Sequence, residues 1–184
     1  MRILGINGIL SHGEDSTDKL LKLLQCRGYD AKPVDYPLAT AFLARFSQKR
    51  NARILKAHHR HGDCLIAHSY GCLISLRAME MGAKFDTVFW FAPAMSEHIV
   101  IPHHACKRLY VIHHLEDLAI KLGSWLWFHD FGKMGAVGYQ GPPDDRVTNL
   151  QTFGESSYDR MLHSHYFSDR RITKWLDFID RTLR

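Results

Sequence analysis

The stretch Asp63–Arg77 reads DCLIAHSYGCLISLR and decides the fold. Its first part, Cys64–His68, is short and almost continuously apolar, which is typical of a strand buried in a parallel sheet. A helix is expected directly afterwards, over Tyr70–Met81, because apolar residues continue until a glycine ends the pattern. A single serine, Ser69, therefore stands at a sharp transition from a buried strand to a helix.

Strands and helices alternate along the rest of the chain. Further strands are expected at residues 2–7, 29–34, 87–92, 108–114 and 147–153, and further helices at about 18–27, 40–61 and 168–183. Short apolar strands separated by helices predict an α/β protein, a three-layer α/β/α sandwich with a mostly parallel sheet. The length of 184 residues fits a single domain over 1–184. Such sheets bind their ligands at the carboxyl ends of the strands.

The turn around Ser69 resembles the Gly-x-Ser-x-Gly nucleophile elbow of the α/β-hydrolases, with Ala67 in place of the first glycine. The sharp turn strains the serine backbone and brings the residues two before and two after it close together. Both must then be small, as Ala67 and Gly71 are. A serine that only caps a helix needs no small neighbours. The resemblance extends over nearly the whole chain and implies a minimal α/β-hydrolase fold.

The acid and the histidine of α/β-hydrolases follow the nucleophile in that order, each after a later strand. Asp117 follows the strand expected at 108–114 and fits the acid, with Glu116 as the alternative. His163 precedes the last helix in a His-Ser-x-x-Phe pattern that is similar to one in small esterases of the family, with His165 as the alternative. The resemblance therefore implies a catalytic triad of Ser69, His163 and Asp117.

An oxyanion hole is implied by Asn7-Gly8-Ile9, which stands where the family usually has His-Gly-x after the first strand. The backbone N–H groups of Ile9 and Tyr70 would stabilise the tetrahedral oxyanion. Water would then release the acyl group from the serine, and no cofactor or metal is needed. The connection between residues 92 and 108 is too short for a large helical lid, so small or accessible esters are the expected substrates.

Composition favours a cytoplasmic protein. The chain is 46% hydrophobic and 23% charged, and its four cysteines show no paired spacing. The longest apolar stretch, 87–95, is far shorter than the roughly 20 residues that span a bilayer, so no transmembrane segment is expected. The apolar N-terminal residues 3–10 are followed by polar residues without a cleavage site, which indicates a core strand and no signal peptide.

Histidines and cations are the remaining conspicuous residues. The 13 histidines include no HExxH pattern and no i, i+4 pair of the kind that catalytic zinc sites use, so we expect no metal site. Five cations recur at helical spacing: Arg45, Lys49, Arg53, Lys56 and Arg60. We interpret them as the solvated face of a helix, with Phe42, Phe46 and Leu55 on or near the buried side, and expect no nucleic-acid partner. The glycine-rich segment 132–141 is expected to be a long irregular connection.

The sequence thus predicts a small serine hydrolase acting on a carboxylic ester. An amidase or thioesterase with the same triad is the closest alternative. An alternative of another class is a protein that keeps this fold only for binding and uses the five cations at helical spacing as its contact surface. A histidine-rich metal carrier is a third alternative. Labelling by a fluorophosphonate would separate the enzyme from both, because only an activated serine reacts.

Overall fold

One parallel sheet of six strands forms the centre of the protein in a computed structural model. The structure describes residues 1–9, 16–37, 41–115, 117, 120, 132–152, 163 and 165–184, and of residues 41–45 it describes the backbone alone. The strands are arranged in the order β2-β1-β3-β4-β5-β6, and every neighbouring pair is parallel. Their bounds are β1 Arg2–Ile6, β2 Asp30–Pro33, β3 Asp63–His68, β4 Phe85–Phe91, β5 Cys106–His114 and β6 Val147–Thr152. The parallel sheet predicted from the short apolar runs is confirmed.

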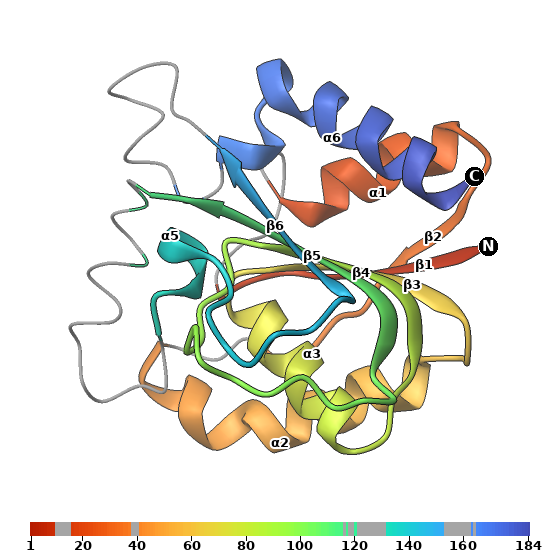
Figure 1. Ribbon diagram of the computed structural model, residues 1–184. Coiled ribbons are helices and arrows are strands. Elements are labelled where there is room, and N and C mark those ends of the chain that lie inside the picture. The colour runs from red at the N-terminus through yellow and green to blue at the C-terminus, as the bar shows by residue number, and fades with distance from the viewer. Residues whose placement is uncertain are drawn as a thin grey trace.

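Helices cover both faces of this sheet. Helices α1 (Thr17–Cys26) and α6 (Asp169–Leu183) lie together on one face, and α2 (Ala41–His58) and α3 (Tyr70–Glu80) on the other (Figure 1). Two short helices complete the described elements, α5 (Met134–Val137) and the 3-10 turn η1 (His165–Phe167). The molecule is therefore the three-layer α/β/α sandwich that the sequence predicts.

Alternation along the strands divides the core into two layers. Ile6, Leu65 and Trp90 are buried on the side of α3, whereas Ile66 and Phe91 are buried on the side of α1 and α6. Successive side chains of a strand point to opposite faces, so a sheet covered on both sides needs apolar residues at nearly every position. This explains why the runs that predict the strands are continuous and do not alternate with polar residues.

The carboxyl ends of the central strands meet at one edge of the sheet. In the register of the sheet His68 is opposite Phe91, and His114 is opposite Thr152. The residues that directly follow these strands are thereby brought together. The connection from 92 to 105 is described throughout and contains no helix, so no large helical lid is inserted between β4 and β5, as predicted.

Two expectations about local packing are wrong. Leu55 is fully buried as expected, but the Phe46 side chain is 77% exposed, because it lies on the outer face of α2. The segment 132–141 is not simply irregular. It contains α5, and a Cβ added at Gly135 would lie 2.8 Å from the carbonyl carbon of Ala92. Glycine there permits the segment to pack closely against the end of β4. The side chains of Phe42 and Arg45 lie outside the described residues.

Candidate active site

Ser69 occupies a strained turn at the end of β3. Its backbone has φ 54° and ψ −122°, a combination that non-glycine residues rarely adopt and that costs about 1–3 kcal/mol. The surrounding backbone holds this conformation: the Ser69 N–H donates to the Phe91 carbonyl at 2.9 Å, and the Ser69 carbonyl accepts from the N–H groups of Cys72 and Ala94. Its side chain is neither fully buried nor fully exposed. Ser69 therefore has the conformation expected of a nucleophile elbow.

Gly71 is required because of the strand next to the turn. A Cβ at Gly71 would lie 2.6 Å from the carbonyl oxygens of both Ile6 and Asn7, which is closer than real Cβ contacts come. The atoms nearest to that Cβ belong to β1 and the turn that follows it, so the physical reason differs from the approach of Ala67 and Gly71 expected from the sequence. Gly71 brings the start of α3 against the backbone that leads to Ile9.

Asp117 and His163 form a hydrogen-bonded pair at the same edge of the sheet. Nδ1 of His163 lies 2.7 Å from Oδ2 of Asp117, and the other carboxylate oxygen accepts the Ile120 N–H at 3.0 Å. The Asp117 side chain is 1% exposed and that of His163 is 21% exposed. An imidazole whose Nδ1–H donates to a buried carboxylate presents its Nε2 outward as a base.

The charge state of Asp117 is set by two opposing effects. Burial raises the pKa of the carboxyl group, but the hydrogen bond and charge of His163, together with the Ile120 N–H, lower it by more. The pKa of Asp117 consequently lies below its ordinary value, and the side chain is an anion at neutral pH. A buried anion beside the imidazole favours the protonated form of His163 when a proton is transferred to it.

His68, directly before Ser69, connects the turn to the histidine loop. Its fully buried ring lies 4.8 Å from the His163 ring, between centroids, and packs edge-on against Phe167. Burial, followed by the charge of His163, lowers the pKa of His68 to about 3, so the ring is neutral. Its Nε2 lies 3.3 Å from the His163 carbonyl and donates to it in the matching tautomer. No pattern in the sequence distinguishes His68 from an ordinary strand residue.

The turn after β1 is held from two sides. The Asn7 side chain accepts from the Thr17 N–H at 3.0 Å and from the Thr17 hydroxyl, and donates to Asp18 at 2.9 Å. The hydroxyl of Tyr36 donates to the Asn7 carbonyl at 2.7 Å. Asn7, which stands where the family usually has histidine, thus ties the loop before Ile9 to the start of α1. The sequence alone does not predict this contact.

The other predicted positions are placed as follows. Tyr70 is the first residue of α3, where helix N–H groups point out along the axis, and its side chain is buried with its hydroxyl 3.2 Å from Ser47 Oγ. His165 is buried in η1, with its ring 4.9 Å from that of His114. Glu116, the alternative acid, lies outside the described residues. Of the two candidate histidines, His163 is hydrogen-bonded to Asp117.

No metal centre or membrane span emerges from the described part of the chain. Among those residues, no three His, Cys, Asp or Glu side chains are grouped so as to hold a metal ion. No described helix is long and apolar enough to cross a bilayer.

Together, the sheet order, the strained turn and the helices on both faces define the α/β-hydrolase fold, so the predicted resemblance is confirmed at the level of fold. The chain is similar to the mouse α/β hydrolase domain-containing protein 10, with a TM-score of 0.60 and 15% identity over 99% of this chain and 89% of that one. It is also similar to a protein described as a YdeN-like hydrolase from Pectobacterium atrosepticum, with a TM-score of 0.55 and 10% identity over 97% and 91%. No family model and no curated protein matches the sequence.

Proposed function

We propose that this protein is a serine hydrolase that cleaves carboxylic esters through Ser69, His163 and Asp117. The observation that carries the proposal is the 2.7 Å hydrogen bond between His163 and the buried Asp117, at the sheet edge where Ser69 stands in a strained turn. An imidazole oriented by a carboxylate can activate a serine hydroxyl for attack on a carbonyl carbon, and Ser69 is partly exposed at this edge.

The reaction has two halves. His163 takes the proton of Ser69 while the Ser69 oxygen bonds to the ester carbonyl carbon, and it then donates that proton to the leaving alcohol. Water, deprotonated by His163, then attacks the acyl carbon; the bond to the Ser69 oxygen breaks, and His163 returns the proton to that oxygen as the acid is released. The N–H groups of Ile9 and Tyr70 stabilise the oxyanion in both halves, which is worth about 3–4 kcal/mol per donor in measured systems.

The substrates we propose are small or accessible esters, because the 92–105 connection carries no helix to cover the edge. Faster cleavage of long-chain lipid esters than of acetate would contradict this substrate class. The four cysteines are free and three of them are buried, which fits the cytoplasmic location that we propose.

The proposal is tested with p-nitrophenyl acetate. We expect turnover by the wild type and a loss of at least 10³-fold in Ser69→Ala, with an unchanged circular dichroism spectrum. Retained turnover in Ser69→Ala would mean that another group is the nucleophile. Comparing His163→Ala with His165→Ala identifies the base, and we expect only His163→Ala to abolish turnover.

A further inference from the structure

The positive charge of the chain is concentrated in one segment. Between Asp35 and Asp63 there are six Lys and Arg residues and no Asp or Glu. The remainder of the chain holds 18 basic and 19 acidic residues, so this segment accounts for the whole net charge of +5. Such an asymmetry indicates a surface for an anionic partner.

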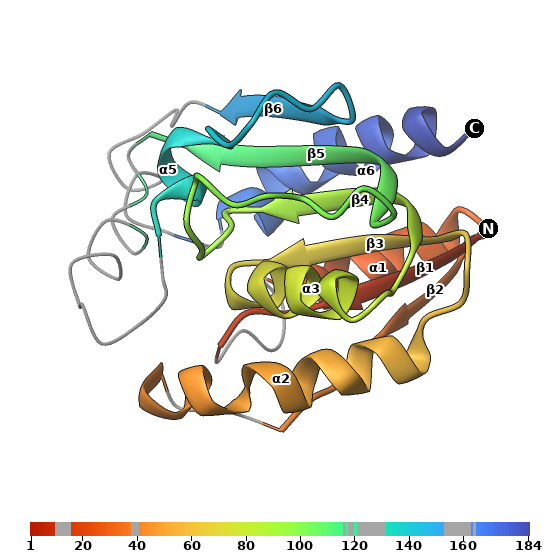
Figure 2. The same ribbon diagram turned by 60° about the horizontal axis from the view of Figure 1, so that its bottom comes forward.

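Helix α2 displays this charge on one side. Its exposed cations are Lys49, Arg50, Arg53 and Lys56, whereas Asn51, Ala52 and Leu55 are buried toward the rest of the molecule. Figure 2 shows α2 as the outermost element on its side of the sheet, with its length lying along the surface. Among the described residues no carboxylate is paired with these four cations. Lys56 donates a hydrogen bond to the Met81 carbonyl, which does not neutralise its charge, and the side chains of Lys49, Arg50 and Arg53 face solvent.

An exposed aromatic side chain lies within the cationic face. Phe46 is 77% exposed and is the largest exposed apolar side chain of α2 whose surroundings are described. Arg50 and Arg53 follow it by four and seven residues, which puts all three on one line along the helix. Exposed cations can contact anionic lipid headgroups while an exposed aromatic ring beside them enters the boundary with the acyl chains.

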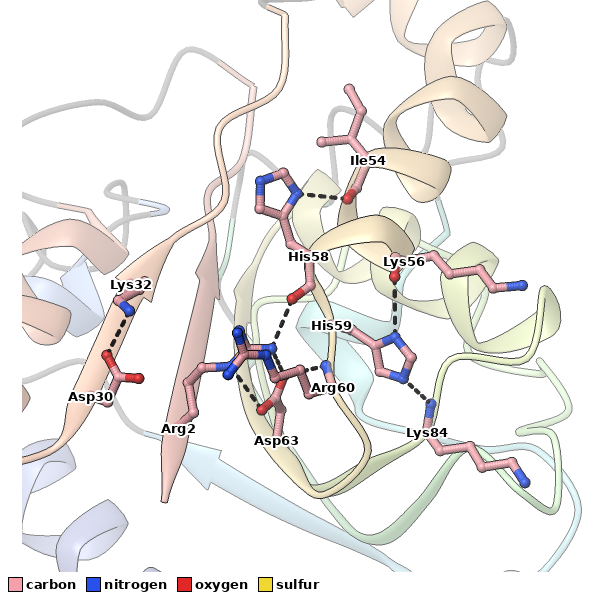
Figure 3. Close-up of polar contacts among 10 residues, drawn as sticks. All are labelled: Arg2, Asp30, Lys32, Ile54, Lys56, His58, His59, Arg60, Asp63 and Lys84. Carbon is pink, nitrogen blue, oxygen red and sulfur yellow. Dashed lines mark hydrogen bonds and ion pairs between the residues drawn. The ribbon is translucent and has the colours of Figure 1, made fainter.

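Figure 3 shows where this face ends, beyond the last turn of α2. Arg2 and Lys32 are paired with Asp63 and Asp30, so their charges are neutralised. His58 and His59 instead bond backbone carbonyls one turn earlier in α2, those of Ile54 and Lys56 at 2.9 and 3.1 Å, and so cap the helix. Among residues 46–62, the cations without a described carboxylate partner are thus those of the helix face and Arg60.

We propose that the outer face of α2, composed of Phe46, Lys49, Arg50, Arg53 and Lys56, binds the surface of an anionic phospholipid bilayer. The cations would contact lipid phosphates and carboxylates, and the Phe46 ring would enter the boundary between headgroups and acyl chains. A nucleic acid fits less well, because the face is the outer side of one helix with a single described aromatic residue, and single-stranded binders use grooves with several stacking rings.

Docking through this face would bring the candidate active site near the bilayer. Phe46 is next to Ser47, whose hydroxyl bonds the hydroxyl of Tyr70, and Tyr70 directly follows Ser69. The binding surface itself shares no residue with the proposed triad. Membrane binding is therefore independent of the proposed hydrolysis, and Ser69→Ala should bind vesicles as the wild type does.

Vesicle co-sedimentation tests the proposal. The probes are large unilamellar vesicles of phosphatidylcholine alone and of phosphatidylcholine with 30 mol % phosphatidylserine, at about 50 mM and 500 mM NaCl. We expect binding only to the anionic vesicles at low salt, since screening weakens surface charge. Each Lys or Arg near an anionic surface contributes about fivefold in affinity. Arg50→Glu/Arg53→Glu should therefore weaken binding at least 100-fold, and Phe46→Ser at least tenfold.

The matched control is Lys22→Glu/Arg170→Glu, which makes the same change in net charge on exposed residues of α1 and α6, on the opposite face of the sheet. It should bind nearly as well as the wild type, and all three variants should retain the turnover of p-nitrophenyl acetate. The proposal is overturned if anionic vesicles are not bound, if control and α2 variants weaken equally, or if a 30-nucleotide single-stranded DNA binds at least as tightly as the vesicles.

Discussion

Replacing Asp117 by asparagine perturbs the proposed mechanism at a single charge. Asparagine has nearly the same shape, and its oxygen can still accept the Ile120 N–H, which Asp117 accepts at 3.0 Å. The variant loses the anion 2.7 Å from Nδ1 of His163. That anion matters most while His163 holds the proton of Ser69, because only then is the imidazole positively charged.

The size of the loss follows from the distance. Two unit charges 2.7 Å apart attract each other by roughly 6 kcal/mol at an effective dielectric constant of about 20. Since about 1.4 kcal/mol corresponds to a tenfold change in rate, this attraction corresponds to about four powers of ten. We therefore expect kcat of Asp117→Asn to fall by about 10³ to 10⁴, with KM changed by less than a factor of about five, because the substrate binds before the charge develops.

The assay is steady-state hydrolysis of p-nitrophenyl acetate at pH 7.5, with thermal unfolding measured on the same samples. The control is Asp86→Asn, because Asp86 is paired with Lys107 at the opposite edge of the sheet and should leave kcat unchanged. A kcat for Asp117→Asn within tenfold of the wild type would refute the reasoning, since the buried carboxylate would then not act on the reacting imidazole.

Three further variants test the supports of the site. His68→Leu should lower kcat ten- to 100-fold at similar KM, because it removes the donor to the His163 carbonyl. The same variant should lose less stability in acid than the wild type does. In the wild type, native His68 stays neutral to about pH 3, whereas the histidine of the unfolded chain takes up a proton below about pH 6.5. The free energy of unfolding of the wild type should therefore fall by about 2 kcal/mol between pH 6.5 and 5 because of this residue. Urea unfolding at both pH values measures this, and equal losses in variant and wild type would contradict it. Gly71→Val should destabilise the protein by more than about 2 kcal/mol, because its side chain would collide with the Ile6 and Asn7 carbonyls; an unchanged melting temperature would show that the contact is not close. Tyr36→Phe should lower kcat about tenfold with little change in stability, since it frees the turn before the oxyanion donor; unchanged kcat would separate Tyr36 from that turn.

The sequence was most informative where the same residues are needed for both the fold and the candidate site. The run Cys64–His68 and the small residue at Gly71 predict a buried strand and a sharp turn, because few other structures accommodate both. The order of serine, acid and histidine then placed Asp117 and His163 at one edge, where the structure brings them into contact. Short, continuous apolar runs that alternate with helical patterns are typical of strands buried in a parallel sheet.

Tertiary contacts account for what the sequence did not predict. His68 looks like an ordinary strand residue, and its role depends on a carbonyl 95 positions away. Phe46 was expected on the buried side because it is apolar, yet Leu55 and Ala52 already fill that side of α2. Gly135 lies in a segment without a periodic pattern, and its requirement for glycine comes from the backbone of Ala92. The partners of His68 and Gly135 are both far away in the chain.

Fluorophosphonate labelling followed by peptide mass spectrometry tests the central claim most directly. The wild-type protein, incubated near neutral pH, should acquire one phosphonyl group per chain, on the tryptic peptide that contains Ser69, and the rate of labelling should fall at least 100-fold in His163→Ala. Absence of labelling, or a label on any other residue, would contradict the assignment of Ser69 as an activated nucleophile.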